Sequence, residues 1–239
     1  MARQHWHSKV EELCPYLPGL PALTEYRILT DVTPGEHEHL LAHGWRRFGP
    51  QYFRPKCASC MECVSLRIPV ATFQPTKSQR RARRKCAHLR IEIGAPQVTE
   101  ERLELFRAWH AMREESRGWV PSVMDADSYI TTFCHPHACA REMAYFDGSR
   151  LIAVGLVDAT ANAVSSIYFF YHPDARAWSP GVASVLFEIE WARQMGCAHV
   201  YLGYRVLGCP STAYKAHYGP HELLTGRPEL EDASVWVSG

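Results

Sequence analysis

The chain has 239 residues and a formal net charge of +1, and 46% of its residues are hydrophobic and 21% are charged. These proportions are ordinary for a globular protein with a sizeable core. No run of apolar residues approaches the roughly eighteen that a membrane span requires, and the amino terminus lacks an apolar signal core. We therefore expect a cytoplasmic protein with no membrane partner.

The charge is divided unevenly along the chain. Residues 1–99 contain 15 Lys and Arg against 8 Asp and Glu, a net charge of +7, whereas residues 100–239 contain 11 against 17, a net charge of −6. The basic front half predicts a polyanionic partner that contacts this half.

The front half predicts short elements with irregular connections. The chain begins loosely and enters a proline-rich stretch at 14–21, where each proline removes a backbone donor. A short helix is expected at Glu36–His43, ended by Gly44, and an aromatic and basic hairpin is expected at 44–55. The remaining strands expected here are 65–70 and 89–94.

From Thr99 onward the pattern becomes that of longer strands and helices. Thr99 and the glutamates after it suit the positive end of a helix, and apolar residues continue it at helical spacing. The later elements expected are strands at 141–148, 150–158 and 163–171, a helix at 179–196 and a buried strand at 197–204. Strands followed by a loop, a helix and a strand predict a mixed α/β (α+β) fold.

Three cysteines, Cys57, Cys60 and Cys63, follow one another at three-residue steps. Their thiolates can point at one centre if the backbone curls, as it does around tetrahedral metal and cluster sites. Cys14 is the expected fourth ligand and Cys86 is the alternative. Four sulfurs suit zinc or a 4Fe–4S cluster, and the spacing does not choose between them. Because the total of nine is odd and no export signal is present, disulfides are disfavoured, and unligated buried thiols are the simpler alternative.

Six basic residues with no intervening acid follow the cysteines: Lys77, Arg80, Arg81, Arg83, Arg84 and Lys85. As a helix, this segment would carry Lys77, Arg80, Arg81 and Arg84 on one face, which suits contacts with phosphates. The preceding hairpin adds Arg46, Arg47 and Arg54 among aromatic residues. Arginines beside aromatic rings favour a single-stranded RNA end, and a solvated basic helix is the simpler alternative.

The helix expected at 179–196 opens on a glycine loop whose amides, near Gly181, can hold an anion or an oxyanion. Acetyltransferases of the GNAT superfamily bind the pyrophosphate of coenzyme A at such a loop. Here Gly181 and Ala183 keep part of that signature, whereas Trp178 and Ser179 replace the rest. Polar residues after the last buried strand complete a candidate active-site floor: Tyr204, Tyr214, Lys215, Tyr218 and Glu222.

Several motifs together resemble the aminoacyl-tRNA–protein transferases. They are CPYLP from Cys14, GWRRFG with YFRP and CxxCxxC from Gly44, RIPV with SQRR from Arg67, and YLGY with AYKAHYGPHE from Tyr201. The resemblance covers most of the chain, to about Leu224. It is nearest to the bacterial branch, whose members place leucine on N-terminal Asp or Glu and so create a degradation signal.

Together with the change of pattern at Thr99, the resemblance implies a small Cys-rich, basic domain at 1–98 and a GNAT-like acyltransferase domain at 99–239. Its co-substrate would be leucyl-tRNA or arginyl-tRNA, and no coenzyme A is expected. The donor ester is already activated and the α-amine has a pKa of about 7.7–8.0, so no serine–histidine–aspartate triad is required.

The resemblance also implies what the site must do. It must position two substrate ends, stabilise an oxyanion near Gly181 and protonate the leaving ribose oxygen. The candidates for that protonation are Tyr204, Tyr214 and Lys215. The candidates for pairing with an acidic N-terminal residue are Arg46, Arg47, Arg54 and Arg205.

Departures from the family pattern leave the donor open between leucine and arginine. Arg205 stands where a tryptophan is usual, Ser211 and Thr212 where Lys-Met is usual, and Pro180 where the loop usually has leucine. Two other functions remain as alternatives. A coenzyme A-dependent N-acetyltransferase with a metal-binding extension would bind acetyl-CoA tightly, and a non-catalytic, redox-responsive RNA-binding protein would show RNA affinity that follows its metal state.

Overall fold

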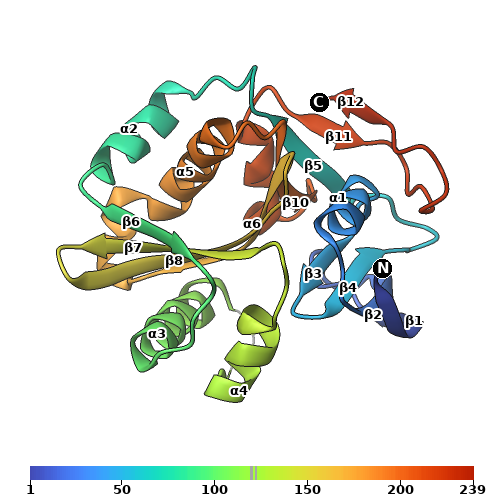
Figure 1. The fold of residues 1–239 in the computed structure, drawn as a ribbon, viewed down its shortest axis with the longest axis horizontal. Helices are drawn as coiled ribbons and strands as arrows, with labels where there is room; N and C mark the ends of the chain where they lie inside the picture. The colour runs from blue at the N-terminus through green and yellow to red at the C-terminus, as the bar shows by residue number, and fades with distance from the viewer. Residues whose placement is uncertain (119–120, 122) are drawn as a thin grey trace.

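In the computed structural model, which describes residues 1–118, 121 and 123–239, the chain forms two sheets (Figure 1). The smaller sheet is antiparallel and has the strand order β1-β2-β4-β3. Its strands are β1 (Arg3–Leu13), β2 (Pro21–Thr30), β3 (Arg46–Phe48) and β4 (Gln51–Pro55). Helix α1 (Pro34–Ala42) contributes Leu40 to a small core with Leu29, Trp45 and Tyr52.

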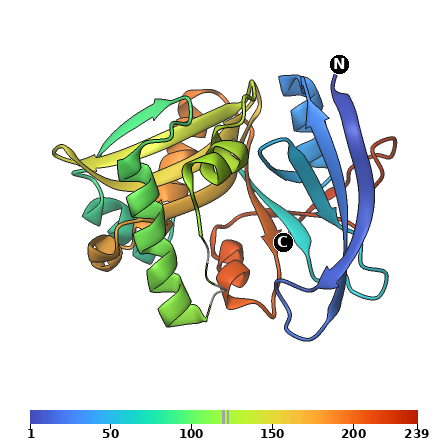
Figure 2. The same cartoon turned by 90° about the horizontal axis from the view of Figure 1, so that it is seen from below.

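The larger sheet has the strand order β12-β11-β5-β10-β9-β8-β7-β6. Its strands are β5 (Val64–Pro69), β6 (Arg90–Gly94), β7 (Ala140–Asp147), β8 (Arg150–Ala159), β9 (Ala163–Tyr171), β10 (His199–Arg205), β11 (Glu222–Leu224) and β12 (Trp236–Ser238). Its neighbouring strands are antiparallel except β9 and β10, which are parallel. Figure 2 shows this sheet beside the smaller one.

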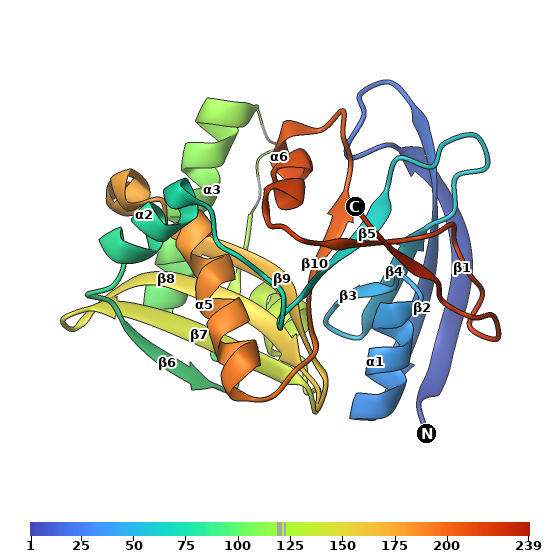
Figure 3. The same cartoon turned by 90° about the horizontal axis from the view of Figure 1, so that it is seen from above.

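Helices cover both faces of the larger sheet (Figure 3). α2 (Lys77–Lys85) and α5 (Pro180–Gln194) pack together on one face, and α3 (Glu100–Arg117) lies on the other. The shorter helical segments are α4 (Ala126–Tyr129), η1 (Ile130–Cys134), η2 (Pro173–Trp178), α6 (Pro210–Ala213) and η3 (Tyr214–His217). Within the described residues, no helix has the length and apolar character needed to cross a membrane.

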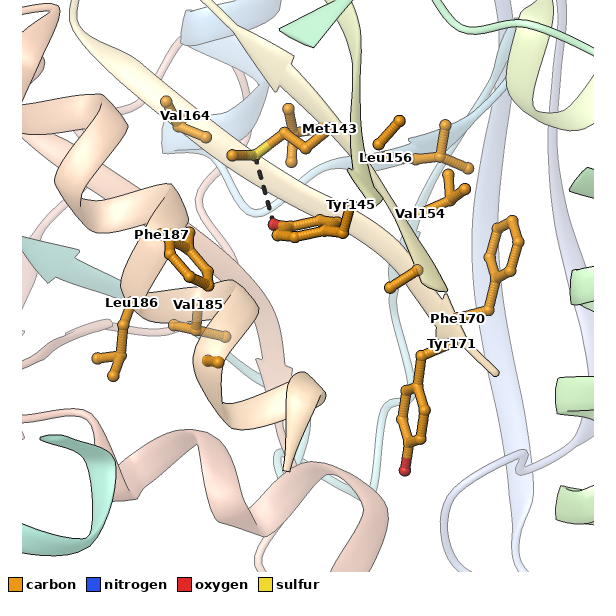
Figure 4. Close-up of a cluster of buried hydrophobic side chains, with 14 of the residues drawn as sticks. Met143, Tyr145, Val154, Leu156, Val164, Phe170, Tyr171, Val185, Leu186 and Phe187 are labelled. Carbon is orange, nitrogen blue, oxygen red and sulfur yellow. Dashed lines mark hydrogen bonds between the residues drawn. The ribbon is translucent and has the colours of Figure 1, made fainter. Parts of the chain in front are cut away.

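The main core fills the space between α5 and the larger sheet (Figure 4). Phe187 of α5 contacts Tyr145 of β7 with ring centroids 5.8 Å apart, and the Tyr145 hydroxyl lies 3.9 Å from the Met143 sulfur. On the other face, Phe106 of α3 packs edge-on against Phe170 of β9 at 5.4 Å. Helices on both faces therefore fix the position of β9, the strand that lines the pocket described below.

Local sequence sets the ends of the helices beside that pocket. Thr99 accepts a hydrogen bond from the Arg102 amide and so caps α3. α5 begins at Pro180, which suits a first helical turn because it lacks an amide hydrogen. The left-handed Gly196, with φ of 76°, follows the last turn of α5.

The mixed α/β class is confirmed, and the strand–loop–helix–strand order expected for a GNAT-like domain is present as β9–α5–β10. The hairpin at 44–55 and the helix over the basic segment are also present. The expectation of a loose start was wrong, because residues 3–13 form β1. This edge strand exposes nearly every side chain and therefore lacks the apolar alternation that predicts a strand.

The sheets do not divide at the boundary that the sequence indicated. β5, α2 and β6 all precede residue 99, yet both strands belong to the larger sheet and α2 packs on α5. The reason is that β5 pairs with β10, a strand far along the chain. The smaller sheet therefore spans only residues 3–55, and the clustered cysteines lie in loops at its margin, between β1 and β2 and between β4 and β5.

Candidate active site

A pocket lies where the two parallel strands separate. β9 and β10 pair only through 163–165 and 199–201, after which their pairing ends. The pocket has a volume of about 580 Å³ and is bounded by β9, Leu202, the first turns of α5, α3 and the α6–η3 segment. A cavity of this size is in the usual range for small-molecule sites.

The pocket has an apolar wall, a cationic side and a polar end. The wall consists of Trp109, Ile167, Tyr168, Phe169 and Tyr171. The cationic side consists of Arg113 and Arg117 from α3 and Arg176 from η2, and the polar end of Ser166, Tyr214 and Lys215. The described residues that line the pocket include no Asp or Glu.

Gly181, Tyr214 and Lys215, predicted to be catalytic, all line this pocket. No atom lies within 4 Å of the place where a Gly181 Cβ would be, so a ligand can approach the backbone of the first α5 turn closely. Lys215 Nζ donates to the Tyr204 carbonyl at 3.0 Å. Burial, and after it the charge of Arg46, lower the pKa of Lys215 to about 7. Lys215 can therefore gain or lose a proton near neutral pH.

Tyr204, also predicted to be catalytic, lies outside the pocket lining. It is 5% exposed, and its hydroxyl donates to the carbonyl oxygens of Gly44 at 2.7 Å and Phe53 at 3.2 Å. These bonds tie β10 to the smaller sheet, so the hydroxyl serves the interface between the sheets. Tyr218, expected to bind substrate, is buried and donates to the Val182 carbonyl at 3.4 Å.

Two of the arginines expected to bind substrate are held in buried ion pairs. Arg47 donates to both carboxylate oxygens of Asp158, with Nε 2.8 Å from Oδ2. Arg54 donates to Glu25 at 2.7 Å and also to Glu229. Both guanidinium groups are therefore already paired and buried, and neither lines the pocket.

Arg46 does not line the pocket either, but it contacts Ser166, which does. It crosses from β3 to β9 and donates to Ser165 Oγ at 2.7 Å and to the Ser166 carbonyl. Glu222 is paired with Arg67 at 2.6 Å on β11, and neither it nor Arg205 lines the pocket.

The basic segment forms α2, and its expected face is exposed. The residues of this face are Lys77, Arg80, Arg81 and Arg84. Arg83 instead lies over the Phe187 ring at 4.1 Å, and Lys85 donates to the Ala177 carbonyl at 2.7 Å. Ala177 adjoins Arg176 on the pocket, so a basic surface continues from α2 to the pocket rim.

The four predicted metal ligands lie near one another. Burial raises the pKa of the Cys63 thiol to about 12, and Cys14, Cys57 and Cys60 all add to the shift, which requires that they lie close by. The alternative ligand, Cys86, is buried in the main core and donates to the Trp178 carbonyl.

Backbone amides also point at two of these sulfurs. Leu17 N donates to Cys14 Sγ at 3.3 Å, and Leu23 N donates to Cys57 Sγ at 3.4 Å. Across the part of the chain that the structure describes, however, no group of three or more His, Cys, Asp or Glu side chains is arranged to hold a metal ion. The donor set suits zinc or an iron–sulfur cluster, whereas the arrangement of the donors does not form a site.

Sequence reasoning missed the cationic side, the aromatic wall and one buried acid. Glu188 of α5 is 1% exposed and accepts a hydrogen bond from Ser166 Oγ at 3.4 Å. Burial raises the pKa of Glu188 to about 8. The sequence did carry a signal for Glu188, because an acid within the apolar run VLFEIEW is expected to be buried. Arg113 and Arg176 carried no such signal, because they lie on separate elements that only the fold brings together.

Helix-terminal amides beside a lysine that titrates near neutrality are features of an acyl-transfer site. The family model described as arginine-tRNA-protein transferase, C terminus, matches residues 101–225, and the corresponding N-terminal model matches residues 12–81. The chain belongs to this family of transferases.

Curated relatives extend the match over nearly the whole chain. The aspartate/glutamate leucyltransferase of Campylobacter jejuni strain 81-176 is 34% identical over 229 residues, covering 95% of this chain and 96% of the relative. The enzymes of the same name from Halorhodospira halophila and Helicobacter hepaticus are 34% and 30% identical, and each alignment covers 95% of this chain and 94% of the relative.

Solved structures are more distant. FemX is 10% identical with a TM-score of 0.46, over 76% of this chain and 63% of FemX. The C-terminal domain of a putative lysylphosphatidylglycerol synthetase from Agrobacterium fabrum is 13% identical with a TM-score of 0.45, over 78% of this chain and 62% of that domain. At these TM-scores, neither similarity supports a functional assignment.

Proposed function

We propose that the protein transfers leucine from leucyl-tRNA to the α-amine of proteins that begin with Asp or Glu, which marks those proteins for degradation in the cytoplasm. The observation that carries the proposal is the pocket between β9 and β10, which combines Gly181 and Lys215 with an apolar wall. Membership of the transferase family supports aminoacyl-tRNA as the co-substrate. The relatives named aspartate/glutamate leucyltransferase support the donor and the acceptor.

The pocket suits leucine better than arginine as the donor side chain. Its wall is aromatic and aliphatic, which favours an apolar side chain. An arginine donor would bring a guanidinium beside Arg113 and Arg176, with no carboxylate among the described lining residues to pair with it.

The reaction is an ester aminolysis. The acceptor ammonium first loses a proton, and its nitrogen then attacks the ester carbonyl carbon of the aminoacyl group. The new C–N bond forms, the C–O bond to the ribose breaks, and the ribose oxygen takes up a proton. We place the transient oxyanion at the amides of the first α5 turn near Gly181, and we assign the proton to Tyr214 or Lys215.

The acceptor stem of the tRNA is expected to contact α2. Its exposed face carries Lys77, Arg80, Arg81 and Arg84, and Arg176 continues this basic surface at the pocket. Cationic side chains along a surface hold phosphates without reading sequence, so the terminal adenosine can enter the pocket from any tRNA that carries the right amino acid.

We further propose that Cys14, Cys57, Cys60 and Cys63 hold zinc or a 4Fe–4S cluster after a local rearrangement. The group would order the loops on which these cysteines lie. Metal analysis together with the iron–sulfur absorption bands distinguishes the two, and a protein that binds neither contradicts the assignment. Thermal unfolding with and without the group measures the structural contribution separately from transfer.

The proposed activity is tested with peptides that begin with Asp, Glu, Lys or Ala and a mixed pool of charged tRNA. A leucine-sized mass gain on the Asp and Glu peptides alone is expected. An arginine-sized gain contradicts the leucine assignment. No gain with intact tRNA refutes the transferase and favours an RNA-binding protein, and an acetyl gain from acetyl-CoA favours an N-acetyltransferase.

A further inference from the structure

Arg46 and Lys215, of which Lys215 lines the pocket, converge on one glycine of β10. Gly203 of β10 has φ of +79° and lies at an irregularity in the pairing of β10 with β5. A Cβ placed there would be 3.4 Å from Arg46 Nε and 3.4 Å from Lys215 Nζ. The two nitrogens are therefore no further apart than twice that distance, and the glycine leaves room for both.

Neither cation has an acidic partner within the described part of the chain. Arg46 donates to Ser165 Oγ and the Ser166 carbonyl, and Lys215 donates to the Tyr204 carbonyl, all of them neutral oxygens. Arg47 and Arg54 of the neighbouring strands differ from Arg46, because each binds a carboxylate.

Neither carboxyl group that faces this pair neutralises it. Asp158 is already occupied by its ion pair with Arg47, and His37 Nε2 lies 3.1 Å from its Oδ2. Glu188 is buried, and its pKa of about 8 keeps it mainly protonated at neutral pH. Cys209 also lies near Lys215; burial raises the pKa of its thiol, but hydrogen bonds with Ser211 and Thr212 outweigh burial and bring this pKa below its ordinary value. Burial and the charge of Arg46 lower the pKa of Lys215 to about 7, so Lys215 is only partly protonated at neutral pH, and an anionic ligand beside the pair would favour its charged form.

We propose that Arg46 and Lys215 together bind the side-chain carboxylate of the acceptor's N-terminal Asp or Glu and so determine acceptor specificity. This inference rests on the proposed function. A guanidinium beside an ammonium provides the several convergent donors that a single carboxylate accepts. Arg117 and Arg176 also line the pocket but are exposed, and Arg176 adjoins Ala177, which Lys85 of α2 contacts, so these arginines suit phosphates better.

The geometry also explains why a neutral residue at the acceptor N-terminus would be rejected. Asn or Gln has the same shape as Asp or Glu but no charge, so it would neither offset the charge of Arg46 nor favour the protonated form of Lys215. In this arrangement Lys215 anchors the acceptor, and Tyr214 remains on the pocket to protonate the ribose oxygen.

The test measures peptide binding and transfer separately, with the full-length protein. Peptides identical except for a first residue of Asp or Asn are titrated by fluorescence anisotropy without tRNA, and KM and kcat are then measured with leucyl-tRNA. The variants are Arg46→Gln, Lys215→Gln and the charge-retaining Arg46→Lys. The control is Arg107→Gln, which removes an exposed arginine of α3 that pairs with Glu100.

We expect wild type to bind the Asp peptide at least about tenfold more tightly than the Asn peptide, since hydrogen bonds to charged groups contribute that much. Arg46→Gln and Lys215→Gln should abolish this preference through weaker Asp binding, Arg46→Lys should retain part of it, and Arg107→Gln should leave it unchanged. An equal weakening of both peptides in folded Arg46→Gln would overturn the inference, as would an unchanged preference.

The two proposals fail in different ways. If wild type binds the Asp peptide selectively but transfers nothing from any charged tRNA, the carboxylate site stands and the proposed function fails. If wild type transfers leucine while it binds Asp and Asn peptides equally, the function stands and the carboxylate site fails.

Discussion

Replacement of Tyr204 by phenylalanine separates a structural role from a catalytic one. Its hydroxyl donates to the carbonyl oxygens of Gly44 at 2.7 Å and Phe53 at 3.2 Å, and the side chain is 5% exposed. Tyr204→Phe leaves these buried acceptors without their donor, which costs about 1–3 kcal/mol. For a domain of this size, each kcal/mol lowers the melting temperature by about 2–4 °C. The folded fraction at 25 °C should remain high, because total stabilities are about 5–15 kcal/mol.

The assay combines thermal unfolding by circular dichroism with transfer of leucine to an Asp peptide. We expect a lower melting temperature for Tyr204→Phe and a kcat within about twofold of wild type. Tyr214→Phe is the matched control, since its hydroxyl lies on the pocket, and it should keep the melting temperature but slow transfer. Removal of a proton-transfer group costs about 10²–10⁴-fold in rate. A decrease of that size in Tyr204→Phe at an unchanged melting temperature would refute the structural role.

The charged residues support three further predictions. Asp158→Asn leaves Arg47 buried without its counter-ion and should lower the free energy of unfolding in urea by about 3–5 kcal/mol; a change below about 1 kcal/mol would contradict the ion-pair assignment. The pKa of Glu188 is raised from 4.5 to about 8, so the folded chain holds a proton that the unfolded chain releases, and this contribution to stability falls as pH rises between those values. Glu188→Gln should therefore gain stability relative to wild type at pH 8 compared with pH 5 in urea titrations, and a pH-independent difference would refute the shift. The third prediction replaces the exposed α2 residues Lys77, Arg80, Arg81 and Arg84 by Gln, which should weaken tRNA binding equally for all sequences. In filter-binding titrations the slope of log K against log[salt] should become shallower by about 0.7–0.9 for each phosphate that the protein no longer neutralises. An unchanged slope would exclude α2 as the tRNA surface.

The elements that sequence predicted well have strong local patterns. The hairpin at 44–55, the basic helix and the strand–loop–helix–strand segment all carry their signal within one short stretch. β11 and β12 do not, because three-residue strands at 222–224 and 236–238 contain too few residues for a period to show. β11 pairs with β5, and β12 with β11, so the placement of both depends on contacts distant in sequence.

The site was only partly predictable for a similar reason. Gly181, Tyr214 and Lys215 stood out because their motifs place them after a buried strand or at a helix start. The roles of Arg46 and Arg47 could not be separated, since they are adjacent in the same motif and differ only in what they face. Adjacent residues of a strand point to opposite sides, which sends Arg47 to Asp158 and Arg46 to β9.

The smaller sheet is therefore part of the pocket's construction and not an appendage to it. Arg46 reaches from β3 to β9, and Tyr204 holds β10 against the Gly44 and Phe53 carbonyls. The loop after Cys14 also contacts the segment that leads to α6, since a Cβ at Gly208 would be only 2.9 Å from a Leu17 methyl carbon. A metal or cluster that ordered the Cys14 loop would thereby also help to order the backbone that leads to Lys215. The arrangement gives a reason for a cysteine cluster in an enzyme whose reaction transfers no electron.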